Sequence, residues 1–128
     1  MAGTAIWTNL GQNLTIDLLD PATRAGVTTT YTIGWGSGNT APAVTDTALV
    51  SENPEARVAA TVSQPAVDTI RYVGTITATG NRTVQEAAVF VATGANAKLR
   101  GVHALLNIET GDRVEYTFDL RLKDNLEA

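Results

Sequence analysis

Few side chains in this sequence of 128 residues could carry out chemistry, since it contains no Cys and a single His. Without Cys the chain has no thiolate nucleophile, no disulfide and no Cys-ligated metal site. His103 could act as a general base only beside an orienting acid and a nucleophile, and the sequence identifies neither of them. A histidine packed within a strand needs no such partners, so we expect no catalytic residue in this chain.

Acidic residues near the expected turns form three pairs. Paired carboxylates can serve glycoside hydrolysis or bind calcium. None of the pairs lies in the Asp-x-Asp-x-Asp-Gly pattern of a calcium loop, so we interpret them as polar turn residues, with opportunistic surface cation binding as the alternative. We therefore expect no metal site and no cofactor. The pairs are Asp17 with Asp20, Glu52 with Glu55, and Glu109 with Asp112.

A glycine-rich stretch, Gly34-Trp35-Gly36-Ser37-Gly38, superficially resembles a loop that holds phosphate. Such loops need a further glycine or a Gly-Lys-Ser/Thr motif and a helix that begins directly behind them. Here Asn39 and Pro42 follow, so no helix N-terminus is available. We interpret the stretch as a flexible or tightly turned loop.

Five residues are candidates for an interaction site rather than for catalysis. Trp35, Ser37 and Asn39 belong to the glycine-rich region, where an exposed indole could stack on a sugar ring or anchor a protein interface. Ordinary core packing is the alternative for Trp35, and the sequence leaves both open. Ile6 and Trp7 lie near the amino terminus and could pack on a neighbouring subunit.

The elements that position these residues are expected to be strands. The chain has 20 Thr and 12 Val, and β-branched residues favour sheets. The pattern of apolar residues and glycine-containing turns predicts an all-β fold, a single antiparallel β-sandwich of Greek-key or jelly-roll-like type. A short helix near 9–19, capped by Thr8 or Asn9, is also expected. The predicted strands lie near 28–35, 57–64, 68–79, 84–92, 98–106 and 113–122.

The last strand has the clearest pattern. Residues 113–122 alternate perfectly, which predicts that Val114, Tyr116, Phe118, Leu120 and Leu122 face the core. The strand at 57–64 is expected to end at Pro65. Gly74 interrupts an apolar face and is expected to mark a bulge or the close crossing of another strand.

Composition limits the partners. Residues 1–128 are expected to form one domain, with 1–10 as a candidate interaction arm. The net charge of −4 and the absence of a basic block argue against nucleic acid, and no apolar run approaches the ~20 residues of a membrane helix. We expect no signal peptide. Only 17% of the residues are charged, and Lys98 and Lys123 are the only lysines. The edge strands therefore have few of the charged side chains that usually prevent pairing with other chains. We expect other chains, most simply copies of this one, to cover those edges.

Several segments together resemble small virion proteins of tailed bacteriophages. In that family a Gly-Trp-Gly-x-Gly-x-Thr-Ala segment precedes Asp-Thr-Ala-Leu, as it does here within 32–49. The stretches 72–80 and 83–90 are similar to its middle strands, although Glu86-Ala87-Ala88 has Ala where the common form has Gly. Arg100-Gly101 and 111–118 are similar to its last hairpin, and 9–13 to an Asn-x-Gly-x-Asn element. The resemblance extends from about Asn9 to Leu122.

The resemblance implies a structural protein of the virion, assembled in the cytoplasm of the host bacterium. The function expected first is capsid decoration, or cement, in which the protein binds the outer shell and bridges capsid subunits. Its partners would be the major capsid protein and copies of itself, with a trimer favoured. The alternative is a tail-fibre or receptor-binding subunit with a glycan-contacting Trp/Gly-rich loop. A hydrolytic tailspike would require a longer chain and a separated acidic pair.

Overall fold

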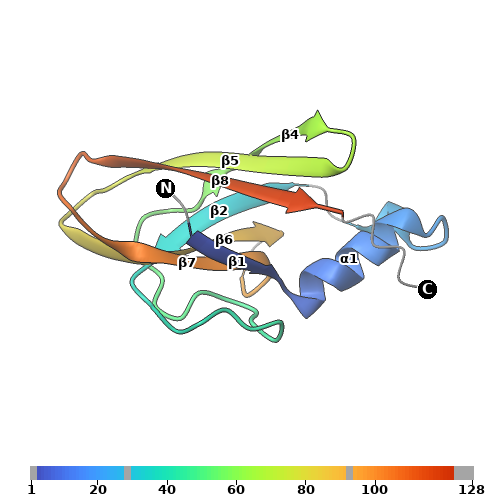
Figure 1. The fold of residues 1–128 in the computed structure, drawn as a ribbon, viewed down its shortest axis with the longest axis horizontal. Coiled ribbons are helices and arrows are strands. Elements are labelled where there is room, and N and C mark those ends of the chain that lie inside the picture. Colours follow the sequence, from blue (N-terminus) through green and yellow to red (C-terminus); the bar gives the residue numbers. More distant parts are fainter. Residues whose placement is uncertain (1–2, 28–29, 92–93, 123–128) are drawn as a thin grey trace.

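Two antiparallel sheets face each other in the computed structural model, which describes residues 3–27, 30–91 and 94–122 (Figure 1). One sheet has the strand order β1-β7-β6-β2-β3 and the other the order β4-β5-β8. The predicted all-β sandwich is confirmed. The elements are β1 (Gly3–Trp7), α1 (Asn9–Leu19), the 3-10 helix η1 (Arg24–Gly26), β2 (Tyr31–Gly36), β3 (Val58–Ala59), β4 (Thr61–Ala66), β5 (Thr69–Thr77), β6 (Arg82–Val91), β7 (Ala97–Ile108) and β8 (Arg113–Arg121).

The last four strands are nested. β5 pairs with β8 in the smaller sheet, while β6 and β7, which lie between them in the sequence, form a hairpin in the larger sheet. The chain therefore crosses between the sheets after β5 and again after β7, an arrangement typical of jelly-roll-like sandwiches. The predicted strand at 57–64 also changes sheets, because β3 ends at Ala59 and β4 begins at Thr61.

The main core lies between the two sheets and includes Ile33, Tyr72, Ile76 and Phe118. Gly74 marks a close crossing, as predicted. A Cβ atom at this position would lie 3.0 Å from Val58 Cγ2 and 3.1 Å from Ile33 Cδ1. Side chains of β2 and β3 therefore pack closely over the backbone of β5, and a Cβ atom at this position would require them to shift.

Two details of the strand predictions are wrong. Tyr116 and Phe118 are buried and Val114 and Leu120 pack against the core, but Leu122 is 59% exposed. Leu122 lies past Arg121, the last β8 residue that pairs with β5, so it does not share the buried environment of that face. Pro65 does not end its strand, since β4 continues to Ala66. Proline is tolerated there because β4 is an edge strand and its register shifts at this point.

The predicted helix is present over Asn9–Leu19, and Thr8 is its N-cap. The fully buried Thr8 hydroxyl accepts a hydrogen bond from the Gly11 N–H at 3.1 Å and donates to the Ala97 carbonyl at 2.6 Å. Gly11 lowers the helix propensity but has a packing role. A Cβ atom there would collide with the Lys98 carbonyl and would lie 2.7 Å from Trp7 Cδ1. The start of the helix is thus attached to β7.

Phe118→Ala and Leu122→Ala test these burial assignments. Phe118 is 8% exposed in the main core, so its truncation should lower the free energy of unfolding by about 3–5 kcal/mol. Truncation of the exposed Leu122 should change it by less than about 0.5 kcal/mol. Urea denaturation followed by circular dichroism measures both values, and equal losses in the two variants would contradict the assignment.

Candidate functional site

Trp35 lies in the core rather than on the surface. Its side chain is 1% exposed, and its indole Nε1 donates a hydrogen bond to Glu55 Oε2 at 3.0 Å. Of the two alternatives that the sequence leaves open, core packing is the one observed. In this position the ring is not available to stack on a sugar.

The segment between β2 and β3 is a long loop, residues 37–57, that lies along the face of the larger sheet turned away from the smaller sheet (Figure 1). Leu49 of this loop packs with Ala88, Phe90 and Ala97 in a second hydrophobic cluster. The part of the larger sheet around β6 is therefore covered on both faces. This explains why the β6 sequence is buried almost continuously instead of alternating.

The Glu86 carboxylate attaches this loop to β6. It accepts hydrogen bonds from the backbone N–H groups of Gly38 at 2.9 Å, Val50 at 2.9 Å and Ser51 at 2.8 Å. A Cβ atom at position 38 would lie 2.6 Å from Glu86 Oε2, so only glycine permits this approach. None of the glycines in the 34–38 stretch has a positive φ. They serve close packing against Glu86 and its surroundings rather than a tight turn.

Arg100, on β7, supplies the opposite charge. Its guanidinium is fully buried and contacts Glu86 Oε1 through Nε at 3.2 Å and Nη2 at 3.0 Å. It also donates from Nη1 to Asp46 at 3.0 Å and from Nη2 to the Thr40 carbonyl at 3.0 Å. We call Gly38, Thr40, Asp46, Glu86 and Arg100 the Glu86–Arg100 cluster. Within it, every charge has a partner, and the first half of the loop is attached to β6 and β7.

A second buried carboxylate, Glu55, holds the far end of the loop. Besides the Trp35 indole it accepts hydrogen bonds from the Thr79 N–H and hydroxyl, both at 3.1 Å, and from Arg82 Nε at 2.8 Å. Burial alone would raise the pKa of Glu55. The hydrogen bonds from the backbone, Trp35 and Arg82 outweigh it and lower the pKa to about 2. Glu55 thus stays ionised as a structural anion.

His103 has no catalytic arrangement around it. Its Nδ1 lies 2.8 Å from the Ala104 carbonyl and its Nε2 lies 2.9 Å from the Tyr116 hydroxyl. Because a carbonyl only accepts, Nδ1 carries a proton, and in the neutral ring Nε2 accepts from the tyrosine. Burial raises the pKa of Tyr116, which keeps this hydroxyl protonated. Over residues 3–27, 30–91 and 94–122, no group of three or more His, Asp or Glu side chains could hold a metal ion.

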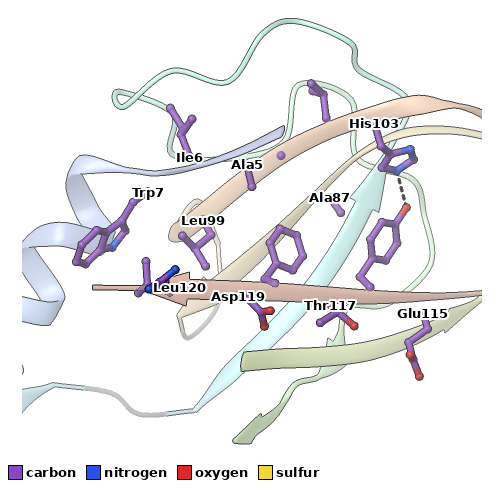
Figure 2. A pocket seen from close by; sticks show the side chains of 15 residues that line it. Ala5, Ile6, Trp7, Ala87, Leu99, His103, Glu115, Thr117, Asp119 and Leu120 are labelled. Carbon is purple, nitrogen blue, oxygen red and sulfur yellow. Dashed lines mark hydrogen bonds between the residues drawn. The ribbon is translucent and has the colours of Figure 1, made fainter. Parts of the chain in front are cut away.

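The other two candidate residues, Ile6 and Trp7, line a cleft of about 520 Å³ between β8 and the β1–β7 side of the larger sheet (Figure 2). β1 lies against its own chain, in antiparallel register with β7 from Gly3↔His103 to Trp7↔Leu99. Ser37 and Asn39 lie elsewhere, on the loop, where Asn39 is exposed and the Ser37 hydroxyl lies 3.1 Å from that of Ser51. The five predicted residues therefore belong to three separate places.

The buried charges were not identified from the sequence. A signal for Glu86 exists, since an acidic residue within the apolar run 84–91 requires a partner if the strand is buried. Glu55 has no such signal, because it lies among polar loop residues and looks like any turn carboxylate.

Comparisons with known proteins identify no relative. No family model matches this chain, and neither curated proteins nor solved structures show significant similarity to it. In the part of the chain that the structure describes, no helix is long and apolar enough to cross a membrane.

Arg100→Met tests the role of the Glu86–Arg100 cluster. Loss of the guanidinium leaves the Glu86 carboxylate buried without a countercharge, which should cost about 3–5 kcal/mol in the free energy of unfolding. Arg71→Met is the matched control, because it breaks the half-exposed Arg71–Asp119 pair and should cost less than about 1 kcal/mol. In the double variant Glu86→Gln/Arg100→Met, part of the loss should be recovered. Equal effects of the two single variants would contradict this role.

Glu55→Gln tests the second anion through pH. The folded-state pKa of Glu55 is about 2 against an ordinary value of 4.5, so its ionisation stabilises the fold above pH 4.5. That contribution, on the order of 3 kcal/mol, should be lost as the pH falls from 4.5 toward 2. Thermal unfolding over this range should show a smaller acid-induced decrease in Tm for Glu55→Gln than for wild type, with the exposed Glu109→Gln as control. Parallel curves for wild type and Glu55→Gln would refute the assignment.

Proposed function

We propose that this chain is a structural protein of a tailed-bacteriophage virion, a decoration protein that binds the outer surface of the capsid and bridges its subunits. The proposal starts from the resemblance of its motifs to small virion proteins. Its partners are the major capsid protein and further copies of the chain, with a trimer favoured by the same resemblance.

One observation carries the proposal. Motif segments that lie far apart in the sequence contribute residues to the Glu86–Arg100 cluster: Gly38, Thr40 and Asp46 from 32–49, Glu86 from 83–90, and Arg100 from Arg100-Gly101. A chance similarity among unrelated turns and strands has no reason to converge on one buried site. The convergence supports a resemblance that reflects a common three-dimensional construction.

The chemistry of the buried groups also favours a structural role. Both buried carboxylates, Glu55 and Glu86, are saturated by donors from their own chain, and both His103 ring nitrogens have partners. None of these three residues is arranged as a nucleophile with its base. We therefore propose that the protein binds and stabilises but catalyses no reaction.

A surface suited to binding lies on the same loop. Val44 and Val50 are about half exposed and Asn39 is exposed, and all three belong to the 37–57 loop that the cluster attaches to the larger sheet. A rigid loop loses little conformational entropy when it docks. The alternative, a glycan-binding tail-fibre subunit, rested on an exposed Trp35, and the burial of that ring removes its main argument.

Localisation on the particle is the direct test of this function. Electron cryomicroscopy of virions that contain the protein should show its density at many symmetric positions on the outer shell. A few copies confined to the tail would refute the decoration role in favour of the fibre alternative.

Asn39→Arg tests the loop as the contact surface. A long charged side chain in the middle of a docked loop should lower the affinity for empty capsid shells at least tenfold, measured by co-sedimentation. Thr77→Arg, at an exposed position of β5, is the matched control and should bind as wild type does. Equal binding by both variants would remove the loop from the interface.

A further inference from the structure

Among the strands of the described residues, β8 has the longest uninterrupted free edge. β8 pairs with β5 through nine consecutive residues without a register shift, and no described strand pairs with its other side. The other edges are short or interrupted: β1 has five residues, β3 has two, and β4 carries Pro65 and a register shift. β8 contains no Pro, no Lys and no bulge, which are devices that usually discourage pairing, and two of its four charged residues, Asp119 and Arg121, are already paired with Arg71 and Asp68.

The cleft between β8 and the β1–β7 side follows this edge. Seven consecutive residues, Glu115 to Arg121, line it, so both faces of the strand contribute. Such a lining arises when a cleft runs along the backbone edge, where alternate N–H and C=O groups point outward. Seven extended residues span roughly 23 Å. The edge thus offers main-chain hydrogen bonds over most of the length of β8.

The opposite wall can receive side chains. Ala5 and Leu99 project from the larger sheet into the space beside β8, whereas Glu115, Thr117 and Asp119 point to its other side (Figure 2). The two sheets have five and three strands, so β1 and β7 have no strand of the smaller sheet beyond β8 to cover them. The space of about 520 Å³ is where the next strand of that sheet would lie.

We propose that this cleft binds an extended segment of a partner polypeptide, which adds to β8 as a fourth strand of the smaller sheet. Every second side chain of the segment is apolar and fills the space in front of Ala5 and Leu99. A basic residue on its outward face meets Glu115. This carboxylate has no ion pair among the described residues, whereas Asp119 pairs with Arg71 and Arg121 pairs with Asp68.

A single strand fits the cleft better than a second folded copy does. Pairing of two whole domains through their β8 edges would bring the β1–β7 side of one copy against the same side of the other, in the space that the added strand requires. An extended segment needs only the cleft. Addition of a peptide strand to an exposed sheet edge is a common mode of recognition, in which the main chain supplies affinity and alternate side chains supply specificity.

The probe for this proposal is a nine-residue peptide with the sequence of β5, Thr-Ile-Arg-Tyr-Val-Gly-Thr-Ile-Thr. This sequence is chosen because β5 itself pairs with β8 in antiparallel register in the fold. Two control peptides carry N-methyl groups on alternate residues, one on the odd and one on the even positions. Isothermal titration calorimetry should show saturable binding of the parent peptide. One methylated peptide should bind at least tenfold more weakly, and the other should bind like the parent, because only one set of amides faces β8.

Two protein variants locate the binding site. Ala5→Glu places a carboxylate at an exposed position of the cleft and should weaken binding of the parent peptide at least tenfold. Ala59→Glu makes the same change at an exposed position of β3, the opposite edge of the same sheet, and should leave binding unchanged. Amide hydrogen exchange of the wild-type protein should show new protection at 113–121 when the peptide is bound.

Several outcomes would overturn the proposal: absence of parent-peptide binding, equal binding of the two methylated peptides, or equal weakening by the two variants. Concentration-dependent protection of 113–121 in the protein alone would assign the edge to a second copy instead. The peptide experiment needs no capsid shell, so its result is independent of the proposed function.

Discussion

The buried carboxylate of Glu86 is the constraint on which much of this structure depends. It lies in a strand that is covered on both faces, where an ionised group without partners would be prohibitively costly. Arg100 and three backbone N–H groups satisfy it, and those N–H groups belong to a loop that has no regular secondary structure. The need to satisfy one anion thus fixes the position of a long loop, and the loop in turn covers the apolar residues of β6.

The sequence predicts the features that local patterns encode. Strict alternation in 113–122 correctly places Tyr116 and Phe118 in the core, and Thr8 caps the helix as its type and position suggest. The same alternation fails at Leu122, because a pattern does not show where the neighbouring strand ends. In the candidate site the limit is tertiary. The β6–β7 hairpin places Glu86 diagonal to Arg100, but a register shift between Val89 and Phe90, on the turn side of this pair, prevents the pairing from being counted from the turn.

The glycines of the 34–38 stretch illustrate how one pattern can serve different physical needs. Glycine is required in phosphate-binding loops because the backbone must approach an anion closely. Here Gly38 also brings a backbone N–H to an anion, but the anion is the carboxylate of the chain's own Glu86. The stretch therefore resembles a phosphate-binding loop because both need glycine where a backbone N–H approaches an anion, although here the anion is a side chain of the same protein. The spacing of the glycines does not show that the anion they approach is Glu86, which lies 48 residues after Gly38.

The two layers on the larger sheet differ in how completely they cover it. The loop is fastened at Glu86 and Glu55 and closes the outer face, while the smaller sheet ends at β8 and leaves β1 and β7 beside an open cleft. The charged residues that attach the loop, Glu55, Glu86 and Arg100, are all buried. Because only 17% of the residues in the chain are charged, their burial leaves few charges for the surface. Fewer surface charges lower the desolvation cost of covering that surface with other chains. The internal ion pairs thus remove charge from the surface, while the edge of β8 stays unpaired among the described residues.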